Sequence, residues 1–154
     1  MNMPDASELN KYNKYFAIQC FNDTWGILDK AEKSEEDIEM ALHLSHVSFW
    51  HWLKVEDHTD ENVSIGYWML SRVYAVAKKG KTALYYGNKC LDISLKSDLP
   101  PFSKAYAYEA LARAYSIKGD EEAKKEALDN ANKYAAEVKE EEDRNMLLGD
   151  LKTI

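Results

Sequence analysis

The chain repeats a pattern of its own residues after an interval of 41 positions. Six positions of the first copy align with six of the second: Tyr67, Leu70, Ser71, Arg72, Tyr74 and Val76 with Tyr108, Leu111, Ala112, Arg113, Tyr115 and Ile117. Four of these pairs are identical and the other two are conservative. Self-similarity at an interval of roughly 20–50 residues indicates stacked supersecondary units, each of which buries its apolar face against the next.

Apolar residues in each copy recur at helical spacing, and strong helix breakers are few. Hydrophobic residues make up 45% of the 154-residue chain, which holds only six Gly and three Pro, too few for the many turns of a β-sandwich or barrel. We therefore predict an all-α fold, a right-handed stack of antiparallel helical hairpins with about seven helices. We expect a single domain over 1–154, with hairpins over about 5–55, 60–98 and 102–139 and a C-terminal capping helix over about 143–153.

Polar caps and glycines mark several of the predicted helix ends. Ser7 and Ser34 are candidate N-caps of the first two helices, and Ser34 with Asp37 has the form of a capping box. Gly80 and Gly119 are predicted to stop the third and fifth helices, because glycine readily takes the left-handed conformation that follows many helix C-termini.

The repeated segment resembles the tetratricopeptide pattern. Tyr67-x-x-Leu70-Ser71-x-x-Tyr74, followed by Ala83, is similar to the aromatic-x-x-Leu-small-x-x-Tyr…Ala pattern of that family. A small residue at the fifth position lets the two helices of a hairpin approach closely, while the large residues fill the space on either side.

The chain also departs from this family. Its repeat is 41 residues rather than about 34, Gly87 stands where a second aromatic residue is expected, and in the second copy Ala123 comes one place early. The resemblance is specific over residues 63–136. It implies a divergent helical stack whose groove binds a peptide or a protein surface.

More narrowly, the whole chain resembles a group of uncharacterised bacterial proteins of similar length. Three stretches carry this likeness: His46-x-Ser48-x-x-His51-Trp52, Gly66-x-Trp68-x-x-Ser71-Arg72-Val73-Tyr74 and Glu109-Ala110-x-Ala112-Arg113-Ala114. The resemblance implies a fold and candidate positions but no chemistry. The candidate ligand- or partner-binding residues are His46, His51, Trp52, Trp68, Arg72, Glu109 and Arg113.

Histidines cluster in the second predicted helix. Glu39, His43 and His46 share one helical face, which in principle offers three metal ligands, but no second group of Cys or His completes a site. We favour an exposed polar stripe over a metal site. His46 and His51 lie about 140° apart around the helix, so they cannot readily act on one ligand. We expect one of them to be a buried, hydrogen-bonded histidine beside Trp52.

Two arginines occupy equivalent positions of the repeat. Trp68 precedes Arg72 by one helical turn, and Glu109 precedes Arg113 by the same interval, an orientation that favours an ion pair. The structural interpretation is such a pair, and we prefer it. The functional interpretation is that both guanidinium groups point into the groove between hairpins and hold a carboxylate or a phosphate.

The net charge, the cysteines and the absence of known motifs argue against several functional classes of protein. A net charge of −7 argues against nucleic-acid binding. The sequence shows no secretory signal and no apolar run of membrane-spanning length, and its two cysteines lie apart among apolar residues, so we expect a cytoplasmic protein with no membrane association. We expect no metal and no cofactor, and neither a nucleophile turn nor a phosphate-binding glycine loop is present.

The leading functional hypothesis is a noncatalytic interaction module that binds a peptide or a protein surface. The apolar final helix and the small number of hairpins, about three, also favour self-association as a homodimer. The alternative is a small-molecule-binding or enzymatic domain with a pocket around His46, His51, Trp68, Arg72 and Arg113. The sequence does not separate aromatic residues that fill the core from those that form a binding platform.

Overall fold

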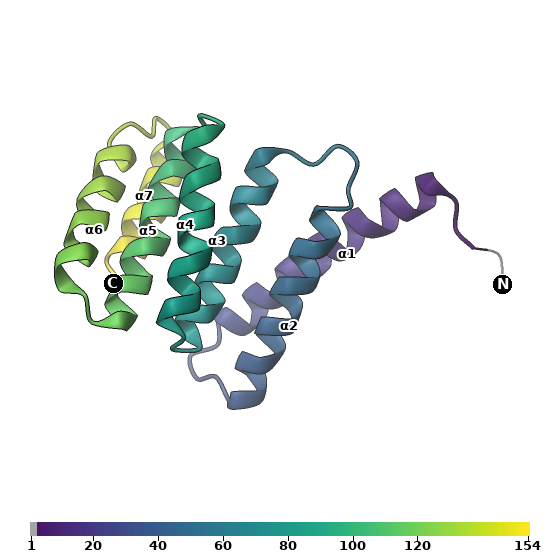
Figure 1. Cartoon of the computed structure of the whole chain (residues 1–154), viewed down its shortest axis with the longest axis horizontal. Coiled ribbons are helices and arrows are strands. Elements are labelled where there is room, and N and C mark those ends of the chain that lie inside the picture. Colours follow the sequence, from purple (N-terminus) through teal and green to yellow (C-terminus); the bar gives the residue numbers. More distant parts are fainter. Residues whose placement is uncertain (1–2) are drawn as a thin grey trace.

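The computed structural model describes residues 3–154 and shows seven helices and no strand in that range. Consecutive helices alternate in direction and lie side by side (Figure 1). The predicted all-α stack of about seven helices is therefore confirmed. The helices are α1 (Ala6–Leu28), α2 (Glu35–Trp52), α3 (Asp60–Val76), α4 (Gly80–Lys96), α5 (Pro101–Lys118), α6 (Glu121–Ala135) and α7 (Glu141–Leu151).

Side-chain caps hold the N-termini of the first two helices. The Ser34 hydroxyl accepts a hydrogen bond from the Asp37 amide (3.1 Å), and the Asp37 carboxylate accepts one from the Ser34 amide (3.0 Å), so the predicted capping box is present. The predicted cap of α1 is wrong, because Asp5 rather than Ser7 caps it and pairs reciprocally with Glu8. An aspartate makes the same hydrogen bond as a serine and adds a favourable negative charge at the helix N-terminus.

Gly119 follows α5 in the left-handed conformation (φ +74°), as predicted. The prediction for Gly80 is wrong: α3 ends at Val76, and Lys78 takes the left-handed position (φ +60°) that Gly119 takes 41 residues later. Gly80 instead begins α4, where an added Cβ would lie 2.8 Å from the Lys118 side chain. Close approach to the end of α5, rather than a left-handed turn, is what Gly80 provides.

The repeated ladder forms the interior of the stack. Leu70, Ser71 and Ala112 are almost completely buried, and Leu111 is 6% exposed. The Ser71 hydroxyl donates to the carbonyl of Ala83 (2.8 Å), so this small residue joins α3 to α4 at close range. Small residues at this level allow neighbouring helices to pack tightly, while the leucines fill the space beside them.

The last two helices close one end of the stack. Leu147 and Leu151 of α7 pack with Ala131 and Ala135 of α6. α6 ends at Ala135, before the predicted end near residue 139, and the connection is fixed by buried Val138. Helix α7 begins at Glu141, slightly before the predicted start near residue 143, and Glu141, Glu142 and Asp143 form its first turn, where their negative charges complement the helix dipole.

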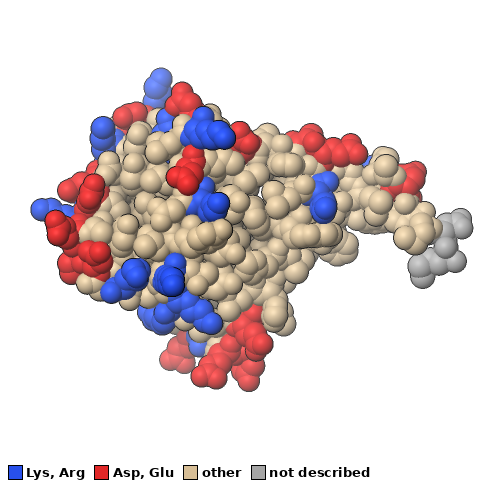
Figure 2. All heavy atoms as spheres, in the orientation of Figure 1, with Lys and Arg blue, Asp and Glu red and all other residues tan. Residues whose placement is uncertain are grey.

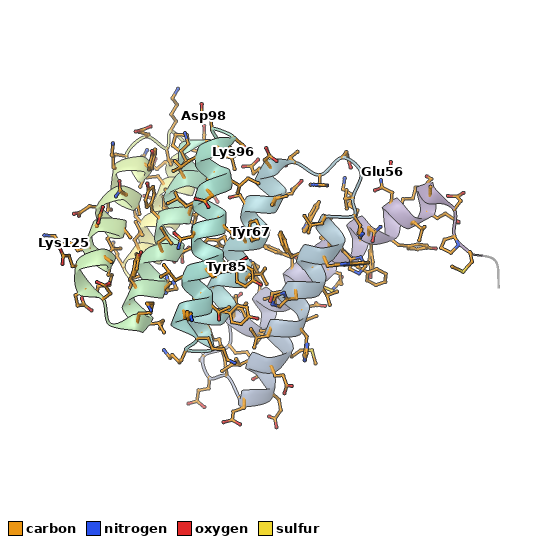
Figure 3. All side chains as sticks on the ribbon, in the orientation of Figure 1. Glu56, Tyr67, Tyr85, Lys96, Asp98 and Lys125 are labelled. Carbon is orange, nitrogen blue, oxygen red and sulfur yellow. The ribbon has the colours of Figure 1, made fainter. Side chains whose placement is uncertain are left out.

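The α1–α2 hairpin diverges from the other five helices (Figure 1). Aromatic side chains fill the wedge between α2 and the α3–α4 pair, including the labelled Tyr67 (Figure 3). The Phe49 ring lies 4.7 Å from the Tyr67 ring and packs directly on Gly66, where an added Cβ would lie 2.2 Å from it. None of the helices within residues 3–154 is both long and apolar enough to span a membrane.

Candidate binding site

The predicted site residues fall into two separate groups. Trp68, Arg72, Glu109 and Arg113 converge on one network that joins α3, α5 and α7. His46 and His51 lie on α2, around a different and shallower hollow. The arrangement therefore does not bring the histidines and arginines into the single pocket of the alternative hypothesis.

Glu109 is the centre of the network. Its side chain is fully buried, and its Oε2 accepts a hydrogen bond from the Trp68 indole Nε1 (2.8 Å). Its Oε1 accepts bonds from Arg113, with Nε at 2.8 Å and Nη2 at 2.7 Å. A buried carboxylate is tolerated only when it is paired and hydrogen-bonded, and these contacts meet that requirement. Trp68 and Glu109 occupy equivalent positions of the repeat, so the two copies bond directly to each other.

Arg72 lies against the same carboxylate. Its Nη2 is 3.4 Å from Glu109 Oε1 and 3.7 Å from Asp150 Oδ1, and its guanidinium carbon is 5.3 Å from the centroid of the Trp68 ring. Burial lowers the pKa of Arg72, and the nearby Glu109 carboxylate opposes that shift. Its Nε and Nη2 are buried without a hydrogen-bond partner of good geometry among residues 3–154. Ion pairing and the tryptophan face therefore hold this cation.

Helix α7 completes the network from the other side. The Tyr106 hydroxyl donates to Asp150 Oδ2 (2.7 Å), and Arg113 Nη2 donates to the Thr153 hydroxyl (2.8 Å). Burial, followed by the bond to Asp150, raises the pKa of Tyr106 and keeps its phenol protonated. Two arginines thus face two carboxylates, Glu109 and Asp150, of the same chain. Each guanidinium already has an internal carboxylate partner, which agrees with the structural interpretation of the repeat arginines.

A cavity of about 270 Å³ lies beside this network. It is enclosed mainly by the first helices of the hairpins together with α7, and five of its lining residues are aromatic. The Trp25 ring is stacked on Trp68 at 5.7 Å, and Tyr106 meets Trp68 edge-on at 5.6 Å. We call this cavity the aromatic pocket; its lining residues are Phe21, Trp25, Glu61, Ser64, Ile65, Trp68, Cys90, Phe102, Ser103, Tyr106, Met146 and Asp150.

The chemistry of the aromatic pocket is apolar with an acidic component. Its charged lining residues are Glu61 and Asp150, and no lysine or arginine of residues 3–154 lines it. Cys90 is buried, with the Ser64 hydroxyl 3.5 Å from its sulfur, and burial raises the pKa of its thiol to about 12. A thiol with that pKa stays protonated at neutral pH and is a poor nucleophile. The pocket is therefore suited to binding rather than to covalent chemistry.

Both candidate histidines of α2 are hydrogen-bonded. His46 Nε2 lies 2.9 Å from the Tyr74 hydroxyl, and His51 Nδ1 lies 2.8 Å from Asn13 Oδ1. Burial lowers the pKa of each, so both imidazoles are neutral at pH 7. One buried histidine was expected, and both are partly buried. Trp52 is partly buried nearby on the same helix.

The metal arrangement considered for α2 does not gather its ligands. Glu39 and His43 are exposed and 3.9 Å apart, whereas His46 is directed to Tyr74. Within residues 3–154, no group of three or more His, Cys, Asp or Glu side chains forms an arrangement that could hold a metal ion.

Sequence reasoning missed most of the aromatic pocket, although part of the signal was present. Glu61, Ser64, Ile65 and Trp68 follow the i, i+3, i+4, i+7 spacing of a single helical face, so the stripe on α3 is visible in the sequence. Asp150 carries no comparable signal, because it lies in the last helix, outside the repeat.

Comparison with protein-family models, with curated proteins and with solved structures gives no match to this chain. We therefore infer its function from the geometry of the pocket and the charged network.

Proposed function

We propose that the protein is a noncatalytic interaction module that holds one side chain of a peptide or protein partner in the aromatic pocket. The observation that carries this proposal is the pocket itself, a cavity of about 270 Å³ with five aromatic lining residues. Small-molecule sites commonly measure about 300–1,000 Å³. This cavity is slightly smaller than that range, and its volume suits one anchoring side chain. Aromatic pockets that receive a single anchor are typical of protein interfaces.

The rigidity of the pocket supports the same function. Trp68 is fixed by the bond from its indole to Glu109, and Tyr106 is fixed by its bond to Asp150. Walls that are held in place before binding lose little conformational entropy when a ligand arrives. The 41-residue repeat supports the proposed relationship to tetratricopeptide-like binding proteins, and the free thiols of Cys20 and Cys90 support a cytoplasmic location.

A matched pair of substitutions tests this proposal. Ile65 lines the pocket and is 42% exposed, whereas Ile18 on α1 is 43% exposed and lies outside it. A peptide selected from a display library against the wild-type protein is measured by calorimetry against both variants. We expect Ile65→Trp to obstruct the pocket and weaken binding at least about tenfold, which corresponds to about 1.4 kcal/mol, and Ile18→Trp to leave it unchanged. Equal binding by both variants would exclude the pocket as the anchor site.

We further propose that a second copy of this chain covers the free end of the stack. Large apolar side chains are exposed there on α1 and α2, whereas α7 covers the opposite end. The rings of Phe16 on α1 and Trp50 on α2 both lie close to the His51 imidazole, with centroids 5.5 Å and 5.0 Å from it, so the two helices contribute to one surface. We call this surface the end patch; it consists of Leu9, Tyr12, Phe16, Val47, Trp50 and Leu53.

The end of a helical repeat stack is shaped to receive another helical pair, and a two-fold contact between identical patches closes the assembly. Light scattering on a size-exclusion column tests this. We expect a dimer for the wild type and a monomer for Trp50→Glu, while Tyr85→Glu, at an exposed position of α4 outside the patch, stays dimeric. A monomeric wild type at every concentration would contradict the proposal.

A further inference from the structure

We propose that the anchor held by the aromatic pocket is a lysine side chain of the partner. This inference rests on the proposed function and adds the chemical class of the ligand. Both charged residues that line the pocket are acidic, and the protein as a whole carries a net charge of −7. An acidic site on an acidic protein attracts cations and repels anions.

The aromatic walls suit a cation as well. The face of an aromatic ring is electron-rich, and it attracts an ammonium or guanidinium group within about 6 Å of its centroid. Trp68 already does this inside the protein, because the Arg72 guanidinium lies 5.3 Å from its centroid. Trp25, Phe21 and Phe102 supply further rings around the cavity.

The two carboxylates keep capacity to accept hydrogen bonds. Asp150 receives the Tyr106 hydroxyl on Oδ2, while its Oδ1 is 3.7 Å from Arg72, beyond hydrogen-bonding distance. Glu61 receives a long contact of 3.4 Å from the Ser103 hydroxyl. An ammonium group has three donors in need of acceptors, and these oxygens provide them.

Lysine fits this combination better than the other side chains. Its methylene stem covers apolar surface while its ammonium stays with polar partners, which matches apolar walls that carry two carboxylates. A carboxylate or phosphate ligand would instead meet Glu61 and Asp150 with no cation of residues 3–154 lining the pocket. Norleucine has nearly the same shape without the charge, so it separates the contribution of charge from that of shape.

The test uses blocked amino-acid amides of lysine, norleucine and glutamate as probes, with the indole N–H signals of Trp25 and Trp68 observed by NMR. At low salt we expect lysine amide to bind at least about tenfold more tightly than norleucine amide. Its advantage shrinks as salt is added, because screening weakens exposed charge interactions. Glutamate amide is expected to produce no shift.

Two variants locate the charge effect. Glu61→Gln removes a carboxylate of the pocket, and Glu56→Gln removes an exposed carboxylate of the α2–α3 connection, labelled in Figure 3. We expect Glu61→Gln to reduce lysine affinity several-fold with norleucine unaffected, and Glu56→Gln to change neither. Equal loss in both variants would mean that lysine is attracted by overall charge and would overturn its placement in the pocket.

The outcomes separate this inference from the proposed function. If norleucine binds as tightly as lysine or more tightly, the lysine inference is wrong while the pocket remains an anchor site. If the selected peptide binds Ile65→Trp unchanged, the proposed function fails first. If glutamate amide binds best, the occupant is an anion and the charge argument is overturned.

Discussion

Helix α3 presents a tryptophan where helix α5, 41 residues later, presents a glutamate, and these two side chains hydrogen-bond to each other. The ladder positions around them are alike: Leu70 and Leu111 are both buried, as are the small residues Ser71 and Ala112. Equivalent positions that stayed alike thus build the stack, while an equivalent pair that became different, Trp68 and Glu109, builds its buried polar centre.

The same contrast appears at two other equivalent pairs, and at a third pair the residue is the same but its neighbour is distinctive. Gly66 of α3 stands opposite the Phe49 ring, whereas its counterpart in α5 is Ala107. Lys78 occupies in strained form the left-handed position that Gly119 occupies without strain. Tyr74 faces a titratable histidine, His46, on the neighbouring α2; its counterpart is Tyr115.

The largest effect is expected from breaking the polar centre. Glu109→Ala leaves the cations of Arg72 and Arg113 buried with one carboxylate fewer, which we expect to lower the free energy of unfolding by about 3–5 kcal/mol. Chemical denaturation monitored by circular dichroism measures the change. Glu126→Ala, at an exposed position of α6, is the control and should stay within about 0.5 kcal/mol of wild type. A small loss in Glu109→Ala would show that the network is not a stabilising unit.

Giving α3 the alanine of α5 tests the second contrast. Gly66→Ala places a Cβ 2.2 Å from the Phe49 ring, and we expect the resulting overpacking to destabilise the protein by roughly 1–2 kcal/mol after the gain in helix propensity. Gly26→Ala in α1 is the matched control, since nothing lies within 4 Å of its added Cβ. That variant should be stabilised by roughly 0.5–1 kcal/mol. Thermal unfolding of the two variants should therefore shift in opposite directions.

Exchanging the left-handed residues sharpens the third contrast. Lys78→Gly should raise the free energy of unfolding by about 1 kcal/mol, because glycine takes a positive φ without steric cost, and Gly119→Lys should lower it by a similar amount. Lys125→Gly, within α6 and labelled in Figure 3, serves as the control of opposite sign. Glycine inside a helix costs about 0.8–1 kcal/mol. Stabilisation in Lys125→Gly would invalidate the reasoning.

The smallest effect concerns pH. Burial, with a contribution from His43, lowers the pKa of His46 in the folded state below its ordinary value of 6.5, so the unfolded chain binds more protons as pH falls through 6.5. Stability is therefore present above that pH and lost below it. We expect His46→Gln, which can keep a hydrogen bond to Tyr74 while Tyr86 stays packed, to show a shallower loss of melting temperature between about pH 7 and pH 5. An unchanged slope would assign the loss to other groups, His51 first.

Sequence reasoning could predict what the repeat and helical periodicity encode. The helices, the buried ladder and the pairing of Glu109 with Arg113 follow from spacing along one chain segment. The shared use of Glu109 by Arg72, and the role of Asp150, depend on how three helices meet in space. Figure 2 shows uncharged residues over much of the middle of one face, with most of the charged side chains nearer its edge. This distribution likewise depends on how the helices meet in space.

Glycine assignments show the same limit. Gly119 was predicted correctly because a left-handed turn is a local property. Gly80 was not, because its reason is the proximity of Lys118, a residue of another helix. The aromatic pocket, like Gly80, depends on contacts between helices. The spacing of its residues on α3 is a local property, but its enclosure by α1 and α7 is not.

The position of Asp150 has a consequence for how the protein comes into being. On the ribosome, α3 and α5 emerge before α7, so Arg72 and Tyr106 are synthesised before the carboxylate that they share. A nascent chain that has not yet released α7 lacks one wall of the pocket and one of the two anions that neutralise its arginines. The pocket and its charged network are therefore complete only once α7 has docked on α3 and α5.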